Sequence, residues 1–153
     1  IDAGTLSTID KDIINIYSNT PQFSSFFKNN NKIQKVKVDT LDNVLNENNI
    51  SSIDLLVLDV EGYEENVLKC FSIEKHKPII FIIEIGDQHP DFVNNKIMMN
   101  KYKILREYFK KNNYTLLVND IVDNVYIHNN IYNKLNRDFI KEIKKLVKFP
   151  QYN

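Results

Sequence analysis

Two continuous apolar runs dominate the middle of the chain. Ile53–Val60 is apolar except at Asp54 and Asp59, and Ile79–Ile85 is apolar except at Glu84. Continuous rather than alternating hydrophobicity is typical of strands that are buried on both faces, as in a parallel sheet. The two runs are therefore predicted to be inner strands of one sheet.

Helical spacing follows each apolar run. Val67, Leu68 and Phe71 mark the inner face of a helix predicted over Glu64–Phe71, and Ile97–Lys111 repeats the pattern with lysines on the opposite side. In this second helix the residues expected on or near the inner face are Ile97, Leu105, Tyr108 and Phe109. Strands that alternate with helices are typical of an α/β sheet with helices on its faces.

The remaining elements are predicted from shorter patterns. They are a helix capped by Ser7 or Thr8, a short helical turn around Phe23, Phe26 and Phe27, a partly exposed strand over Lys32–Val38, a helix after the N-cap Thr40, a tight turn at Gly62, a hairpin of Tyr114–Val118 and Asn124–His128, and a helix from Asp138 to Val147. The last helix is basic and amphipathic. We interpret it as a packed helix with one solvated face rather than a membrane or nucleic-acid contact.

Composition narrows the classes of function. The chain has 153 residues, of which 42% are apolar and 26% charged, as in one ordinary globular domain. Twenty basic and twenty acidic side chains give no net charge, which argues against nucleic acid or an anionic membrane as a partner. The longest apolar run, Ile79–Ile83, is far shorter than the roughly 20 residues of a membrane span. The single cysteine, Cys70, rules out an intrachain disulfide and favours a reducing, cytoplasmic compartment; we expect it to be buried.

Carboxylates stand where the two apolar runs end. Asp59 and Glu61 lie at the end of the first run, and Glu84 ends the second. In open α/β sheets ligands bind outside the carboxyl ends of the strands, and like charges held close together raise one another's pKa. If the two strands are neighbours, the three carboxylates form a site with a candidate general base. Glu64 and Glu65 lie in the first turn of the next helix, where its dipole favours acidic side chains, and we interpret them as structural.

The loop after the second run offers another candidate site. Its sequence GDQHPD supplies Asp87, His89 and Asp91, which are residue types that can hold a divalent cation. A solvated turn closed by Pro90 explains the same residues without a metal.

Five segments of the chain form a recognisable series. They are LSTID (Leu6–Asp10), VKVDTLDNVL (Val36–Leu45), IDLLVLDVEGYEENVLKCF (Ile53–Phe71), KPIIFIIEIG (Lys77–Gly86) and LREYFKKNNYTLL (Leu105–Leu117). In order and spacing, from about Leu6 to His128, the series resembles the FkbM family of S-adenosylmethionine-dependent methyltransferases. The family pattern has a serine-threonine step, a threonine-leucine-aspartate before a short helix, a strand followed by DvEGxE, and a proline-led strand that ends in glutamate.

The resemblance implies a fold, a cofactor and a reaction. The fold would be a seven-stranded Rossmann-like class I methyltransferase in three α/β/α layers, of which this single domain holds strands four to seven and residues 131–153 form a helical extension. Asp59 would lie at the tip of strand four beside the methyl-transfer centre, with Glu61 and Gly62 shaping the loop, and Glu84 at the tip of strand five. The cofactor would be S-adenosyl-L-methionine, and the acceptor a hydroxyl of a sugar or small metabolite, whose proton a carboxylate takes.

Glycine usage departs from the family pattern. The family has a glycine-rich loop near its N-terminus that holds the cofactor, whereas the glycines here are Gly4, Gly62 and Gly86, so no G-x-G loop is possible. The chain also does not begin with methionine. We therefore expect the C-terminal half of a methyltransferase, with the other half supplied in cis or in trans. Without that half the sheet would have an uncovered edge.

Three functions stay open at this point. The first is the O-methyltransferase whose cofactor half lies outside these residues. The second is a non-catalytic remnant or interaction module that keeps the half-fold. The third is a metal-dependent hydrolase that uses Asp59, Glu84, Asp87 and His89.

Overall fold

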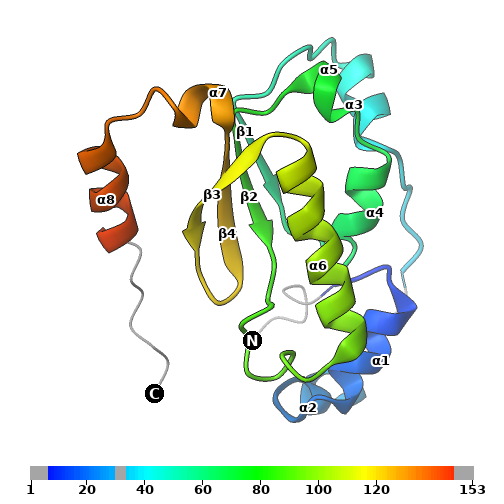
Figure 1. Ribbon diagram of the computed structural model, residues 1–153. Coiled ribbons are helices and arrows are strands. Elements are labelled where there is room, and N and C mark those ends of the chain that lie inside the picture. Colours follow the sequence, from blue (N-terminus) through cyan, green and yellow to red (C-terminus); the bar gives the residue numbers. More distant parts are fainter. Residues whose placement is uncertain (1–6, 30–33, 147–153) are drawn as a thin grey trace.

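Four strands form one mixed sheet, with the order β1-β2-β4-β3 (Figure 1). The structure is a computed structural model that describes residues 7–29 and 34–146. The strands are β1 (Leu55–Leu58), β2 (Ile80–Glu84), β3 (Tyr114–Asn119) and β4 (Asp123–His128). β1 and β2 are parallel, whereas the β3–β4 hairpin joins β2 in the antiparallel sense through β4. The predicted α/β sheet and hairpin are confirmed.

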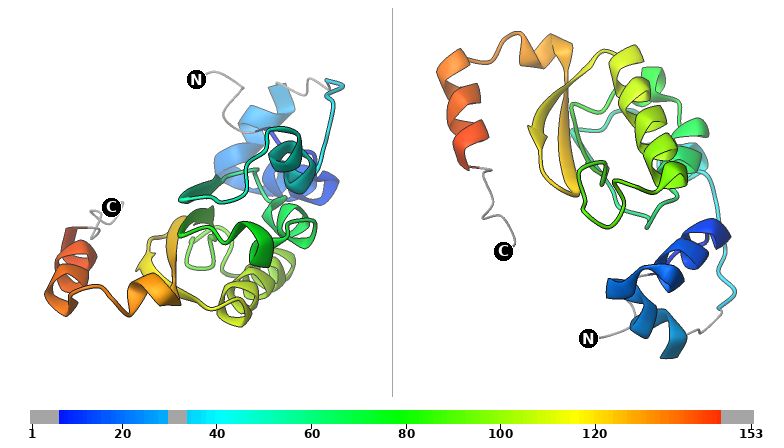
Figure 2. Two further views of the ribbon diagram at one scale, coloured as in Figure 1. Left: turned by 90° about the horizontal axis from the view of Figure 1, so that it is seen from above. Right: turned by 60° about the horizontal axis from the view of Figure 1, so that its bottom comes forward.

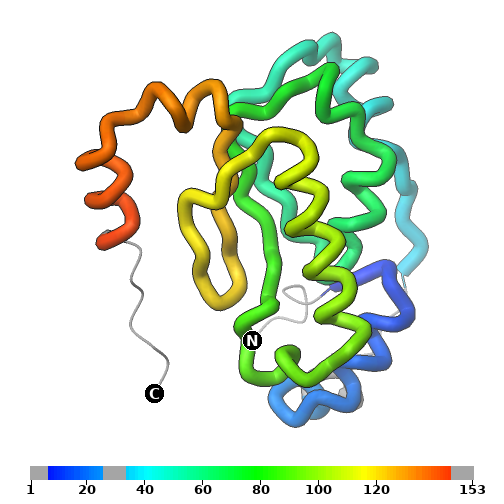
Figure 3. Tube along the Cα trace, in the orientation of Figure 1, coloured from blue at the N-terminus to red at the C-terminus, as the bar shows by residue number. Residues whose placement is uncertain are grey.

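Eight helices of the described residues surround this sheet (Figures 1 and 3). They are α1 (Lys11–Asn19), α2 (Pro21–Asn29), α3 (Leu41–Glu47), α4 (Glu64–Lys69), α5 (Ile73–His76), α6 (Lys96–Lys111), α7 (Asn129–Tyr132) and α8 (Arg137–Leu146). α4 and α6 lie on one side of the sheet, and α8 lies beyond the hairpin (Figure 2). α1 and α2 form a pair past the carboxyl ends of β1 and β2, which is where ligands bind in such sheets.

The main core lies between the sheet and α6. Phe109 of α6 stacks on Tyr126 of β4 with ring centroids 4.0 Å apart, and meets Phe81 of β2 edge-on at 5.0 Å. Leu58 and Ile83 extend this core towards the carboxyl ends of the strands. Burial of large aromatic side chains stabilises by several kcal/mol in all, at about 1.5–3 kcal/mol for each apolar residue. The ends of β1 and β2, which carry the carboxylates, therefore pack directly on the hydrophobic core.

The other side of the sheet is only partly covered. Leu117, Val118 and Ile127 form a second cluster, against which Ile140 and Ile143 of α8 pack. This confirms α8 as a packed helix.

At the far edge, no described strand pairs with the outer side of β1. Side chains alternate between the two faces of a strand, so Leu58 joins the core on the α6 face, whereas Leu55 and Val57 lie on the opposite face and are 51% and 58% exposed. The prediction that the first apolar run is buried on both faces is therefore wrong for β1.

Local patterns predicted the helix starts with mixed success. Thr40 caps α3, as predicted, because its hydroxyl accepts a hydrogen bond from the amide of Asn43 at 3.2 Å. α1 begins later than predicted, since its N-cap is Asp10 rather than Ser7 or Thr8. At α8 the side chain of Asn136 accepts from the amide of Asp138, so Asp138 lies inside the first turn. The predicted end of that helix, Val147, lies outside the described residues.

One strand prediction and two burial predictions are wrong, because tertiary neighbours decide strand pairing and burial. The predicted partly exposed strand Lys32–Val38 begins outside the described residues, and residues 34–38 form no strand there. Ile97 is exposed because the inner face of α6 begins at Met98. Cys70 is also exposed, because it is the C-cap of α4 and lies beyond the last helical residue, Lys69.

Candidate active site

A tight turn joins β1 to α4 and carries the first carboxylates. Glu61 and Gly62 are both in the left-handed region, with φ of 52° and 87°. A side chain at Gly62 would place its Cβ 2.5 Å from Cγ1 of Ile13 in α1, so only glycine fits. Glu64 closes the turn because its Oε1 accepts hydrogen bonds from the amides of Val60 and Gly62, both at 3.1 Å. The predicted turn at Gly62 and the structural role of Glu64 are confirmed.

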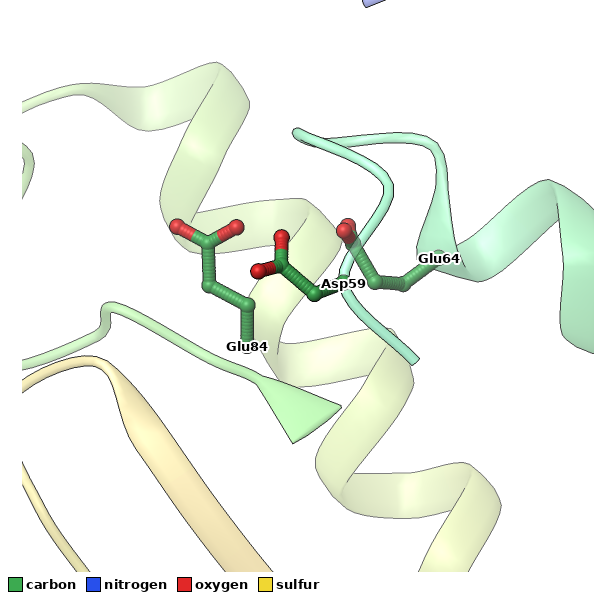
Figure 4. Close-up of side chains that lie close together, drawn as sticks. All are labelled: Asp59, Glu64 and Glu84. Atoms are coloured by element: carbon green, nitrogen blue, oxygen red, sulfur yellow. The ribbon is translucent and has the colours of Figure 1, made fainter. Parts of the chain in front are cut away.

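Three carboxylates converge at the ends of β1 and β2. One oxygen from each of Asp59, Glu64 and Glu84 lies within 4.8 Å of the others, and Figure 4 shows Asp59 between the two glutamates. The pairing of β1 with β2 brings Asp59 and Glu84 together, as the sequence predicted for neighbouring strands. Carboxylate oxygens at this spacing could also hold a divalent cation. Glu61 lies in the adjoining turn and accepts a long hydrogen bond, 3.4 Å, from the hydroxyl of Tyr17.

Burial and mutual repulsion raise the pKa values of this cluster. Burial raises the pKa of Glu84 to about 8, with added repulsion from Glu64, Glu61 and Asp59. Burial, and then the charge of Asp59, raises the pKa of Glu61 to about 7. The pKa of Glu64 is raised as well, because burial outweighs its two amide hydrogen bonds. Near neutral pH the cluster therefore holds protons that ordinary surface carboxyls would have lost.

Two tyrosines line the same region. Tyr17 of α1 and Tyr102 of α6 are both buried, and the nearby charge of Glu84 adds to burial in raising the pKa of each phenol. The Tyr102 hydroxyl lies against Gly86, where a Cβ would approach it to 3.0 Å. Both phenols stay protonated at neutral pH and can donate hydrogen bonds to a ligand or to the carboxylates.

A model of the methyltransferase FkbM domain matches residues 4–116. The chain belongs to the FkbM methyltransferase family. No curated protein and no solved structure matches it. In this FkbM chain the match covers β1, the carboxylate turn, β2 and α6 and ends within β3, so the whole acidic cluster lies inside the matched segment.

The loop residues of the other candidate site lie apart from this cluster. Asp87 is held by Arg106 of α6 through two hydrogen bonds of 2.8 Å, from Nε and from Nη2. His89 accepts from the amide of Asp91 and packs on the ring of Phe92, with centroids 4.8 Å apart. Among the described residues, the cluster with metal-ligand spacing contains neither Asp87 nor His89.

Other residues of the site could not be found from the sequence. The sequence analysis interpreted Glu64 as a structural residue in the first turn of the helix, although it also belongs to the cluster. Tyr17 and Tyr102 come from helices distant in sequence, and no local motif marks them. Within the described part of this FkbM chain, no helix has the length and apolar character needed to cross a membrane.

Proposed function

We propose that this FkbM chain is the C-terminal half of an S-adenosylmethionine-dependent O-methyltransferase that acts on a hydroxyl of a sugar or other small molecule. The observation that carries the proposal is the convergence of Asp59, Glu64 and Glu84 at the carboxyl ends of two parallel strands, beside Glu61. The order of the four strands supports their assignment as strands four to seven of a Rossmann-like class I sheet. The single cysteine favours a reducing compartment, and we propose the cytoplasm.

The acidic cluster fits a positively charged cofactor. S-adenosylmethionine, when bound, supplies an electrophilic methyl group on a sulfonium sulfur. The positive charge of the bound cofactor would be attracted by those of the neighbouring carboxyl groups that are ionised, and these groups are Asp59, Glu61, Glu64 and Glu84. Asp59 and the Gly62 turn are the described residues that we place nearest to it.

The same carboxylates are suited to take the proton of the acceptor. Methyl transfer to a hydroxyl requires a base that takes up the hydroxyl proton, and the carboxylates of this chain would supply that base. Glu61, with its pKa raised to about 7, is about half ionised at neutral pH, which suits a general base, whereas Glu84, with its pKa raised to about 8, is mostly protonated there and takes up a proton only in its ionised fraction. Asp59 is exposed at the strand tip and is the third candidate base.

The open side of β1 supports a second half-fold. Leu55 and Val57 leave an apolar surface on β1, whose outer edge pairs with no strand among the described residues, and Val36 and Val38 are exposed as well. Exposed edges of this kind associate with further strands. We propose that the polypeptide with the glycine-rich cofactor loop adds there, in cis or in trans. A non-catalytic interaction module that keeps the half-fold would use the same surface, and it is the alternative.

Cofactor binding separates these two functions. Calorimetry with S-adenosylmethionine should show no binding to this chain alone and binding to the protein that also carries the glycine-rich half. Asp59→Ala should then lower methyl transfer at least tenfold, whereas Asp54→Ala, an exposed aspartate at the start of the same run, should leave it unchanged. Absence of binding in the complete protein would refute the methyltransferase and favour the interaction module.

A further inference from the structure

Three segments meet at Gly62, and a single lysine joins them. Lys101, in the middle of α6, donates a hydrogen bond to the carbonyl oxygen of Gly62 at 3.1 Å. Its ammonium group also forms an ion pair with Asp10, the N-cap of α1. The side chains of Lys101 and Asp10 are only 17% and 13% exposed, so this pair is largely shielded from solvent.

Two residues of α1 also contact the same turn directly, without Lys101. Ile13 lies against Gly62, and the hydroxyl of Tyr17 donates to Glu61 at 3.4 Å. The carboxylate of Asp10 accepts from the amide of Asp12, so the group that pairs with Lys101 also starts the helix. Lys101 therefore ties the beginning of α1 to the backbone of the carboxylate turn.

The turn needs such support because its conformation is costly. A residue other than glycine in the left-handed region, here Glu61, is strained and persists only where its surroundings fix it. Glu64 fixes the turn through the amides of Val60 and Gly62, and Lys101 fixes it through the carbonyl of Gly62. Rotation of the peptide between Gly62 and Tyr63 would break the bond to Lys101 and redirect the turn.

We propose that Lys101 is a positioning residue of the active site, which locks the Glu61–Gly62 turn against α1 and thereby holds Asp59 and Glu61 in register with Glu84. This inference rests on the proposed methyltransferase function. Lys101 acts through the turn rather than on the substrate. Its ammonium group donates hydrogen bonds to the Asp10 carboxylate and to the Gly62 carbonyl oxygen.

Amide hydrogen exchange on this chain tests the lock without any enzymatic activity. In Lys101→Met the amides of Val60 and Gly62 should exchange at least tenfold faster, while those of β2 and β4 keep their rates. Lys101→Arg should retain the slow exchange. Lys103→Met, on the same helix with a side chain that is 74% exposed, is the matched control and should change neither set.

The exchange result can also overturn the proposal. Lys101 does not fix the turn if the exchange rates of the Val60 and Gly62 amides in Lys101→Met stay within twofold of those in the unmodified chain. An equal acceleration of exchange throughout the sheet would lead to the same conclusion. If Lys101→Met alone does not fold, the double variant Lys101→Met with Asp10→Asn replaces it. This variant removes both charges of the ion pair, and its amide exchange rates are compared with those of the unmodified chain.

Kinetics of the complete methyltransferase test the consequence for the reaction. A small misplacement of reacting groups costs up to about 100-fold in rate. Lys101→Met should lower kcat by 10- to 100-fold while the KM values for cofactor and acceptor stay within threefold, and Lys101→Arg should recover most of the loss. A kcat within twofold of the unmodified enzyme would refute the positioning role. An inactive unmodified enzyme would refute the proposed function instead, and the exchange result would still decide whether Lys101 locks the turn.

Discussion

Replacement of Glu84 by glutamine should make the folded protein more stable at alkaline pH. The carboxyl group of Glu84 has an ordinary pKa of 4.5 and a folded-state pKa of about 8, raised first by burial and then by neighbouring carboxylates. Because the folded state holds this proton more tightly, the resulting stabilisation is fully present below pH 4.5. It is lost as the pH rises through about 8. Glutamine stays neutral throughout, so the variant does not incur this loss.

The expected magnitude follows from the pKa difference. A difference of about 3.5 corresponds to about 5 kcal/mol, at 1.36 kcal/mol for each pKa unit. Glu84 shares its repulsion with Glu64, Glu61 and Asp59, and removal of one charge lets the others ionise more easily. We therefore expect Glu84→Gln to gain about 2–5 kcal/mol over the unmodified chain at pH 9 and little at pH 5.

Urea unfolding at pH 5, 6, 7, 8 and 9 measures this gain. The chain has no tryptophan, so circular dichroism is the suitable signal. Glu107→Gln removes a carboxylate whose side chain is 67% exposed and should leave the pH dependence unchanged. If the stability difference between Glu84→Gln and the unmodified chain were equal at pH 5 and pH 9, the reasoning about the buried cluster would be refuted.

Three further predictions concern the turn, the Asp87 loop and the open edge. Gly62→Ala should lower the free energy of unfolding by about 2–4 kcal/mol in urea titrations, because its Cβ would collide with Ile13 at a positive φ; an unchanged midpoint would contradict this. Arg106→Lys should cost about 2 kcal/mol by the same assay, since lysine cannot reproduce the two-pronged contact with Asp87, and equal stability would argue against that network. Val57→Lys should leave the unfolding midpoint of the isolated chain nearly unchanged but abolish its association with the glycine-rich half, as measured by size-exclusion chromatography; retained association would place the interface elsewhere.

Local patterns of apolar and polar residues in the sequence determined which segments form helices and which form strands, and where the two central strands end. Continuous apolar runs predicted the parallel pair, and the shorter runs after residue 113 predicted the hairpin. Thr40 was found as a cap because a hydroxyl satisfies the free amides of a helix start within three residues. Asp59 and Glu84 were found because a charge at the end of an apolar run is visible in the sequence itself.

Only the tertiary structure decided which of these groups are buried and which meet. Val57 of β1 is exposed because it lies on the face of the sheet opposite the main core, although the sequence of β1 is typical of a strand buried on both faces. Glu64 is 3% exposed because the turn folds back over it, and Lys101 reaches Gly62 across 39 residues of sequence. Burial and hydrogen bonding depend on neighbours supplied by distant parts of the chain, and a local pattern does not specify those neighbours. The carboxylates could therefore be named from the sequence, but their raised pKa values and the lysine that holds their turn follow from the fold.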